Sequence, residues 1–366
     1  MDAVLAALYE PAPVGGSGGR RQAGLGRSSP QVARWLGDIR RYFPTSVVQV
    51  MQRDAIERLD LTRLLLEPEM LAAVEPDIHL VGTLLALQAY LPDEARATAR
   101  RVVATVVADI EARLARPLRQ TVVGALRRHL RSRRPRPGDV DWHRTIQANL
   151  RHWLPERRVL VPEHVLGFGR LAPAVQRELV IAIDQSGSMA ESAVYAGVMG
   201  SALASVAALR TSVVGFSTDV VDLTAALGDP VEVLFGIHLG GGTDINRAVA
   251  YCEGLIARPA ESVLIIVSDL FEGGLAGEME RRLAALVRSG VTCLVLLALS
   301  DDGAPAHDHG RAAVLASLGI PCFACTPGAF PDLLAAAIQR RDLDRWAGEQ
   351  GFVTSSGYLP SALGRA

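Results

Sequence analysis

The second half of the chain alternates between apolar runs and segments with helical periodicity, and this alternation restricts the fold more than any other feature. The apolar runs are nearly continuous in Val, Ile and Leu, as in strands buried on both faces of a sheet. Six strands are expected, at residues 178–184, 211–217, 220–224, 262–269, 291–299 and 320–325. Helices are expected near residues 191–209, 230–236, 244–257, 276–289, 310–318 and 328–341. This order predicts an α/β fold with a doubly wound, mostly parallel, six-stranded sheet.

One pair of these strands is an exception to the parallel arrangement. The strands at 211–217 and 220–224 are joined only by Thr218 and Asp219. A link of two residues permits a hairpin but no crossover, so this pair must be antiparallel.

The first half of the chain is predicted to be helical. Apolar residues recur there at the i, i+3, i+4, i+7 spacing, for example Val32, Trp35, Leu36 and Ile39. With 366 residues the chain is long enough for two domains of ordinary size. We expect a flexible segment at 1–30, an all-α domain at 31–140, a connecting segment at 141–177, the sheet domain at 178–341 and a weakly patterned tail at 342–366.

Polar side chains follow the strands of this predicted sheet. Asp184, Ser186 and Ser188 alternate directly after one strand, Asp269 ends another, and Thr243 follows three glycines. In open α/β sheets ligands bind beyond the carboxyl ends of the strands, where the strand order reverses. Carboxylate and hydroxyl oxygens suit a hard divalent cation, so the turn with Asp184, Ser186 and Ser188 is predicted to bind Mg²⁺. Mn²⁺ and Ca²⁺ stay open as alternatives, although few direct carboxylates argue against tight Ca²⁺ binding.

The pattern D-x-S-x-S, then T, then D resembles the metal-ion-dependent adhesion site of von Willebrand factor A (VWA) domains, whose sheet has one antiparallel edge strand. The resemblance implies that Ser186 and Ser188 bind the metal directly and that Thr243 binds it directly or through water. It also implies that Asp184 and Asp269 act mostly through hydrogen bonds to bound water and to the serines. A cation held in this way stays electrophilic and can accept a carboxylate from another protein.

Further stretches resemble bacterial CoxE-type VWA proteins. They are R-W-L-G-D-I-R-R-Y-F-P at 34–44, W-H-R-T-I-Q-A-N-L at 142–150, V-P-E at 161–163 and I-D-Q-S-G-S-M at 183–189. Such proteins are typically paired with MoxR-type AAA+ ATPases and are thought to serve metal-cofactor insertion, complex assembly or stress responses. The resemblance therefore implies a non-enzymatic adaptor. Its expected partners are a protein that offers an Asp or Glu to the metal and a MoxR-type ATPase.

Other interpretations of these residues stay open. Ser188 and Thr243 could cap helices, and Asp184 could stabilise a turn. A metal-dependent phosphoesterase could use the same crevice, but it would need a nucleophile or a base beside the ion. The nucleophile elbow G-x-S-x-G is absent, and Ser186 stands where an aspartyl-phosphate enzyme has its second Asp.

Polar residues outside the motif suggest further roles. Asp301 and Asp302, with the H-D-H sequence at 307–309, form an acidic, His-containing loop that could be a second metal site, a partner contact or a solvated loop. Glu272 follows Asp269 closely enough to help position water. His238 precedes the glycine loop and could gate it.

Charge is distributed unevenly although the net charge is −1. Residues 96–144 contain 13 Arg against 4 acidic residues, a net charge of +9, whereas residues 178–341 contain 18 acidic residues against 9 Arg, a net charge of −9. The run R-S-R-R-P-R at 131–136 is either a solvated linker or a site for an acidic partner or nucleic acid. Aromatic residues do not interleave with it to stack bases, so nucleic-acid binding is the weaker expectation.

Cysteine usage and hydropathy indicate the compartment. Cys252 and Cys293 are expected to be buried, and the C-x-x-C pair Cys322 and Cys325 lies in an apolar strand and cannot complete a four-ligand zinc site. This usage fits a reducing cytoplasm. Neither a signal peptide nor an uncharged apolar run of about 18 residues is visible, so we expect a cytoplasmic protein without a membrane span.

Overall fold

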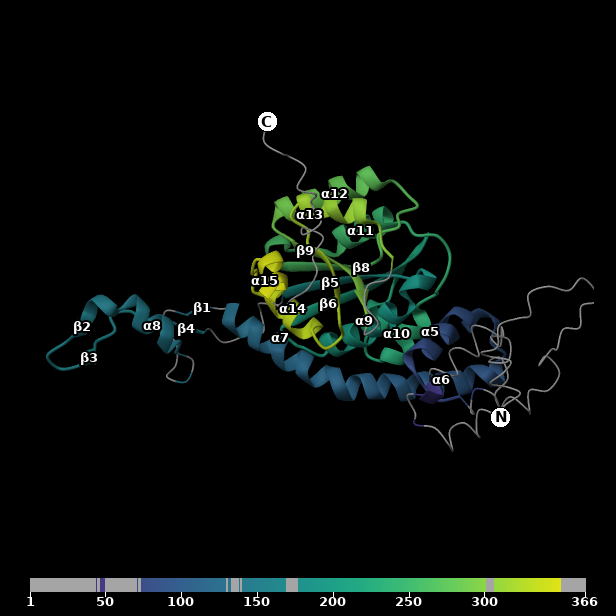
Figure 1. The fold of residues 1–366 in the computed structure, drawn as a ribbon, viewed down its shortest axis with the longest axis horizontal. Helices are drawn as coiled ribbons and strands as arrows, with labels where there is room; N and C mark the ends of the chain where they lie inside the picture. The colour runs from purple at the N-terminus through teal and green to yellow at the C-terminus, as the bar shows by residue number, and fades with distance from the viewer. Residues whose placement is uncertain are drawn as a thin grey trace, which may run out of the picture. The chain divides into compact units, whose positions relative to one another are not determined.

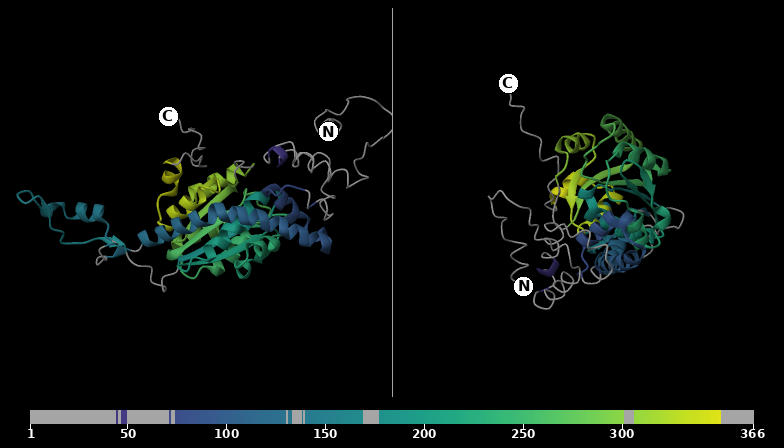
Figure 2. Two further views of the ribbon diagram at one scale, coloured as in Figure 1. Left: turned by 90° about the horizontal axis from the view of Figure 1, so that it is seen from below. Right: turned by 90° about the vertical axis from the view of Figure 1, so that its right-hand side faces the viewer.

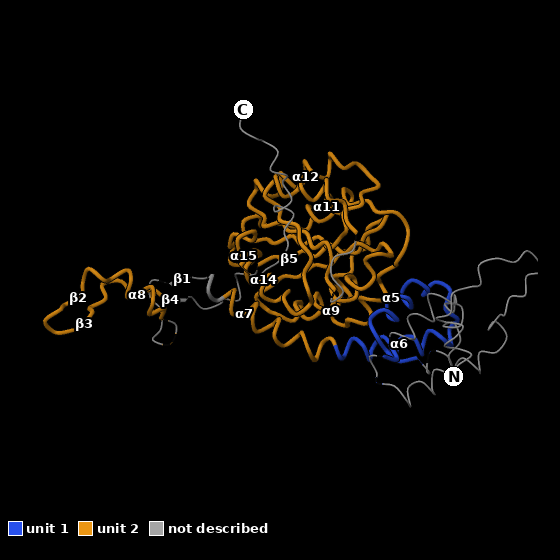
Figure 3. The backbone as a smooth tube through the Cα atoms, viewed as in Figure 1, with its two compact units in different colours: residues 1–109 blue, residues 110–366 orange. Residues whose placement is uncertain are grey.

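The computed structural model describes residues 44, 47–49, 71, 74–129, 131–132, 138, 140–168, 177–300 and 306–349. The chain divides into two compact units, residues 1–109 and 110–366 (Figure 3). The described elements of the first unit are helical: α5 (Ile78–Leu87), η2 (Gln88–Tyr90) and most of α6 (Asp93–Ile110). Asp77 caps α5 by accepting the N–H of Leu80 at 2.6 Å. The predicted flexible segment at 1–30 lies outside the described residues.

The second unit is built on a six-stranded sheet with the order β10-β9-β8-β5-β6-β7 (Figure 1). Its strands are β5 (Arg177–Asp184), β6 (Leu209–Phe216), β7 (Val220–Asp222), β8 (Ser262–Val267), β9 (Thr292–Leu299) and β10 (Cys322–Cys325). All neighbouring pairs are parallel except β6 and β7, which are antiparallel. The predicted fold, with its single antiparallel hairpin, is therefore confirmed.

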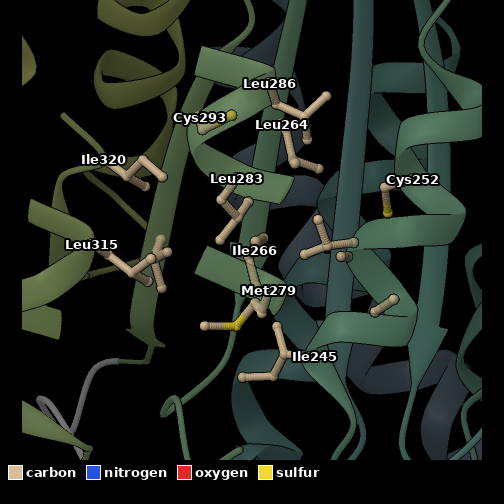
Figure 4. Packing of buried hydrophobic residues seen from close by; sticks show 14 of the residues in the cluster. Ile245, Cys252, Leu264, Ile266, Met279, Leu283, Leu286, Cys293, Leu315 and Ile320 are labelled. Carbon is tan, nitrogen blue, oxygen red and sulfur yellow. The ribbon is translucent and has the colours of Figure 1, made fainter. Parts of the chain in front are cut away.

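Helices cover both faces of this sheet (Figures 1 and 2). The main ones are α9 (Ala190–Ala204), α10 (Pro230–Gly236), α11 (Ile245–Leu255), α12 (Ala276–Ser289), α13 (His309–Ser317) and α14 (Phe330–Ile338). Short helical turns are η6 (Gly187–Met189), η7 (Thr224–Ala226) and η8 (Pro259–Glu261). One buried cluster joins α11, α12 and α13 to the inner strands, and Figure 4 shows part of this core.

On the opposite face α9 lies very close to the sheet. A Cβ atom added at Gly200 of α9 would come within 2.7 Å of the Val213 side chain on β6. Because glycine lacks this atom, the helix backbone can approach the strand, which buries α9 almost completely.

Helix α7 (Arg116–His129), which follows η3 (Glu111–Ala115), groups with the sheet unit. It packs against α14 and α9, and Nε of Arg119 donates to the carbonyl of Ala202 at 3.3 Å. The last part of the predicted 31–140 helical domain thus belongs to the unit that contains the sheet. The predicted tail also contains structure, because α15 (Leu343–Glu349) buries Leu343, Trp346 and Ala347.

Residues 140–168, which we call the arm, contain α8 (Trp142–Ala148), η5 (Leu150–His152), β2 (Trp153–Leu154), β3 (Val159–Leu160) and β4 (Gly167–Phe168). β2 and β3 form an antiparallel hairpin, and β4 pairs with β1 (Arg131–Ser132). Apart from residue 140, the arm lies in the predicted connecting segment at 141–177.

The outer strands of the main sheet are short. β7 has three residues, and β10 has four with a register shift against β9. Among the described residues, no helix is both long enough and apolar enough to span a membrane.

Candidate metal centre

The predicted site lies where the winding of the sheet changes direction. β5 is flanked by β6 on one side and by β8 on the other, and both pairs are parallel. The chain leaves β5 through α9 toward β6 and later returns through α11 to β8. Asp184 ends β5, and Asp269 follows β8 by two residues, so the two carboxylates reach the same edge.

Asp184 is fully buried and both of its carboxylate oxygens accept hydrogen bonds. Oδ1 accepts the backbone N–H of Ser186 at 2.9 Å, and Oδ2 accepts the hydroxyl of Ser268 at 2.6 Å. Burial raises the pKa of Asp184, and the nearby charge of Asp269 adds to the rise, although the bonds from Ser268 and Ser186 oppose it. The side chain is therefore fixed in place, and a positive charge nearby would stabilise its ionised form.

The two serines connect Asp184 to Asp269. The hydroxyls of Ser186 and Ser188 lie 3.3 Å apart, and Ser188 donates to Oδ2 of Asp269 at 2.6 Å. Asp269 itself is 3% exposed. Four of the five predicted residues thus belong to one hydrogen-bonded network, drawn from two stretches more than 80 residues apart in the sequence.

Thr243 is brought to this edge by its backbone. The carbonyl of Thr243 accepts the N–H of Gly273, four residues after Asp269, at 2.8 Å. At the other end of the loop Gly240 donates to the carbonyl of Gln185, also at 2.8 Å. The hydroxyl of Thr243 makes no hydrogen bond to the described part of the chain. It lies on the correct loop but outside the network.

Glycine is required in the loop that carries Thr243. Gly240 and Gly241 have φ values of 120° and 94°, in the left-handed region where other residues are strained. The loop also leads directly into α11, because Asp244 caps this helix by accepting the N–H of Arg247 at 2.8 Å. A displacement of Thr243 would therefore act on the first turn of α11.

The residues present fit a hard divalent cation. The donors are two carboxylates and neighbouring hydroxyls, all oxygen, which is the ligand type that Mg²⁺ prefers. Adjacent ligands of an octahedral Mg²⁺ ion lie about 2.9 Å apart, and the two serine hydroxyls are separated by a comparable 3.3 Å. Within the described residues no group of three or more His, Cys, Asp or Glu side chains could hold a metal, so any site here depends on hydroxyl ligands.

Glu272 holds backbone groups beside the site, and its predicted positioning of water stays a prediction. Its Oε2 accepts the N–H of Ile245 at 2.7 Å and its Oε1 accepts the N–H of Gly274 at 2.8 Å. Burial raises the pKa of this carboxyl group. Both oxygens are occupied by backbone donors, so Glu272 fastens the start of α11 to the loop after β8.

The remaining sequence candidates are more peripheral. Nδ1 of His238 lies 3.0 Å from the carbonyl of Gly236, and the side chain is exposed. The rings of His307 and His309 are in contact, with centroids 4.1 Å apart and planes tilted by 56°, and Asp308 caps α13. Asp301 and Asp302 lie outside the described residues, as does most of the Arg-rich run at 131–136.

Ser268 is a site residue that the sequence reasoning missed. Its hydroxyl donates to Asp184 and accepts the N–H of Leu270 at 3.1 Å, so it links the ends of the two central strands. The available signal was its position, because it directly precedes Asp269 at the end of an apolar run. All four cysteines are buried and free, as their apolar surroundings predicted.

Comparison with known proteins gives matches over most of the chain. A family described as "VWA domain containing CoxE-like protein" matches residues 114–334. The uncharacterized protein YehP of Escherichia coli (strain K12) is 36% identical over 340 residues, which cover 93% of this chain and 90% of YehP.

Solved structures resemble smaller parts of the chain. An aerotolerance-related membrane protein from Bacteroides fragilis NCTC 9343 is 16% identical, with a TM-score of 0.36, over 45% of this chain and 99% of that chain. A von Willebrand factor type A structure from Catenulispora acidiphila is 16% identical, with a TM-score of 0.34, over 47% of this chain and 44% of that chain.

Proposed function

Because the chain belongs to the family of VWA-domain-containing CoxE-like proteins, we propose that it is a non-enzymatic adaptor that binds other proteins through a divalent metal ion. The family is the one that the sequence motifs indicated. In this proposal Ser186, Ser188 and Thr243 bind Mg²⁺, or Mn²⁺ or Ca²⁺ in its place. Asp184 and Asp269 hold the site together through hydrogen bonds.

The observation that carries the proposal is the network of Asp184, Ser186, Ser188 and Asp269 at the switch point of the sheet. Its two carboxylates are buried, and nearly all of their oxygens accept hydrogen bonds from the protein. A bound divalent ion would supply positive charge with a free coordination position. A partner's Asp or Glu side chain is the natural ligand for that position.

The hydrogen bonds of the neighbouring side chains support a binding role. Ser188 is hydrogen-bonded to a carboxylate that is itself buried, and Glu272 is committed to backbone donors. In this proposal the Asp269 carboxylate orients the Ser188 hydroxyl toward the ion, and the Glu272 carboxylate anchors backbone N–H groups. Both roles are consistent with a site that recognises a partner protein.

A MoxR-type AAA+ ATPase is the partner that we propose, by the resemblance of this chain to CoxE-type proteins. The pair would act in the assembly or remodelling of a client protein, or in the insertion of its metal cofactor. The loop that carries Thr243 leads into α11, so occupation of the site could be transmitted to that helix.

The experiment has two stages. Isothermal titration calorimetry of the full chain with Mg²⁺ should show binding that Ser186→Ala abolishes, whereas Ser205→Ala, at the far end of α9, should leave it unchanged. A pull-down of a purified MoxR-type ATPase is then performed with Mg²⁺ and with EDTA. Equal capture under both conditions, and by Ser186→Ala, would remove the metal from the mechanism.

A further inference from the structure

The arm, residues 140–168, carries an unusual share of exposed apolar side chains. The structure describes thirteen large apolar side chains as exposed, and seven of them lie between residues 142 and 161. They are Trp142, Ile146, Leu150, Trp153, Leu154, Val159 and Val161. With on the order of 100 Å² exposed on each, they approach the roughly 800 Å² that one partner contributes to an interface of standard size. Trp142, Ile146 and Leu150 recur at a spacing of four along α8 and η5, and exposed apolar surface gathered in this way usually marks an interaction site.

A buried polar clasp gives the arm a defined shape. Asn149 is fully buried, and its amide nitrogen donates to the carbonyls of Thr145 at 2.7 Å and His164 at 2.8 Å. Its oxygen accepts the N–H groups of Glu163 at 2.8 Å and His164 at 3.1 Å. The hydroxyl of Thr145 exchanges two further hydrogen bonds with Leu166, both of 3.0 Å. A preorganised arm loses little conformational entropy when it binds.

The tip of the arm is the turn Pro155–Arg158 between β2 and β3. Arg158 has a φ of 49°, a left-handed conformation that glycine would adopt without strain. The side chain of Arg158 is exposed, so the tip presents its guanidinium group to solvent. Glu156 is exposed beside it, and its carboxylate has no hydrogen bond or ion pair with the described residues. The other acidic residues of the arm are engaged: Asp141 caps α8, and Glu163 pairs with Arg151 at 3.2 Å.

The rim of the metal centre is complementary to this tip in its exposed apolar side chains and in its charge. The loop between β8 and α12, which contains Asp269, exposes Phe271 (53%) and Leu275 (62%). Residues 178–341 carry a net charge of −9, which would attract Arg157 and Arg158. The metal centre itself calls for an exposed carboxylate, and Glu156 is flanked by exposed apolar residues and arginines.

We infer that the tip of the arm binds the metal centre of a second copy of this chain, with the carboxylate of Glu156 directed to the metal. This inference rests on the proposed function, because it names one ligand of the same site. The contact joins two different surfaces, so it is heterologous and can extend head to tail into a ring or a chain.

The test is the mass of the full chain in solution, measured by sedimentation and light scattering up to about 100 µM protein, which reveals association with a Kd near or below that value. In Mg²⁺ the wild type should exceed its monomer mass of 39.0 kDa, and EDTA should return it to the monomer. Glu156→Gln should stay monomeric, whereas Glu163→Gln on the same arm should associate as the wild type does. Arg158→Gly should fold at least as stably and associate roughly 2- to 5-fold more weakly, the value of one exposed charge pair.

Mixing two variants isolates a single contact. Glu156→Gln keeps its metal centre, and Ser186→Ala keeps its tip, so each alone should be monomeric and the mixture should form a heterodimer of twice the monomer mass. A wild type that binds Mg²⁺ in calorimetry but stays monomeric overturns this inference and leaves the proposed function standing. Association that persists in Glu156→Gln or in EDTA also overturns it. Failure of the wild type to bind Mg²⁺ overturns both.

Discussion

Replacing Asp184 by Asn would remove one of the two buried carboxylates of the metal centre and keep the shape of the side chain. One carboxylate oxygen accepts the N–H of Ser186 at 2.9 Å, and the other accepts the hydroxyl of Ser268 at 2.6 Å. The amide oxygen can keep the first bond, and the NH₂ group can donate to Ser268 once that hydroxyl turns. We therefore expect the free energy of unfolding in EDTA to stay within about 1 kcal/mol of the wild-type value, the net worth of one hydrogen bond.

The response to Mg²⁺ should change much more. At 100 times Kd, a bound ion stabilises the native state by about 2.7 kcal/mol. For a folded region of this size that corresponds to an increase in Tm of roughly 5–10 °C. The variant has lost one of two carboxylates at the site, so we expect its Tm to rise by less than about 1 °C.

Thermal unfolding of both proteins, each in Mg²⁺ and in EDTA, measures these quantities. Asp222→Asn is the matched control, because Asp222 also ends a strand and accepts two hydrogen bonds, from Thr224 and Tyr251, both of 2.8 Å. The control should keep the full response to Mg²⁺. A rise in Tm of wild-type size in Asp184→Asn would refute the role assigned to Asp184, and unfolding of this variant in EDTA would refute the hydrogen-bond argument.

Two further predictions concern stability. Glu178 is buried, and although burial opposes ionisation, hydrogen bonds from the Arg258 backbone and other donors lower its pKa. The carboxylate therefore stabilises the fold above its unfolded pKa of about 4.5 and loses this effect as the pH falls through the lower folded value. Glu178→Gln should lower the free energy of unfolding by about 2–3 kcal/mol at pH 7. Urea denaturation of both proteins from pH 7 to pH 3 should show this difference shrinking as the pH falls. A difference that does not change with pH would contradict the role assigned to the carboxylate. Gly200→Ala should destabilise by about 1–3 kcal/mol, because its Cβ would meet the stiff side chain of Val213 at 2.7 Å. Gly254→Ala is the control, because Gly254 is an exposed position of α11 where an added Cβ has no neighbour. In urea titrations this change should be neutral or stabilise the fold by up to about 1 kcal/mol. Equal effects at Gly200 and Gly254 would argue against close packing of α9.

The sheet was predictable because its strands are buried on both faces. A strand such as β8, with every residue buried, is apolar in all but its first residue, and that composition is visible without knowledge of its neighbours. The site residues at the strand ends were predictable for a related reason. Strand ends in a parallel sheet meet at one edge, and the resemblance to VWA domains placed the strands of Asp184 and Asp269 beside the point where the strand order reverses.

The remaining features depend on contacts that the sequence does not record. The periodicity of α7 predicts a helix with one apolar face, but it cannot say that this face packs on α14. Likewise, Glu272 is a typical ligand-type side chain, and only the structure shows that backbone N–H groups take up its oxygens. The clasp of the arm joins Asn149 to residues about fifteen positions away, and a single Asn in the sequence gives no sign of this.

The short outer strands β7 and β10 limit how copies of this protein can meet. With three and four residues, they offer an incoming strand few backbone groups to pair with, so fibre-like growth through the sheet is disfavoured. At high protein concentration these two edges therefore offer little template for irreversible β-aggregation. If copies do associate through an ion, the free concentration of that ion, rather than the amount of protein alone, would decide when assemblies form and when they come apart.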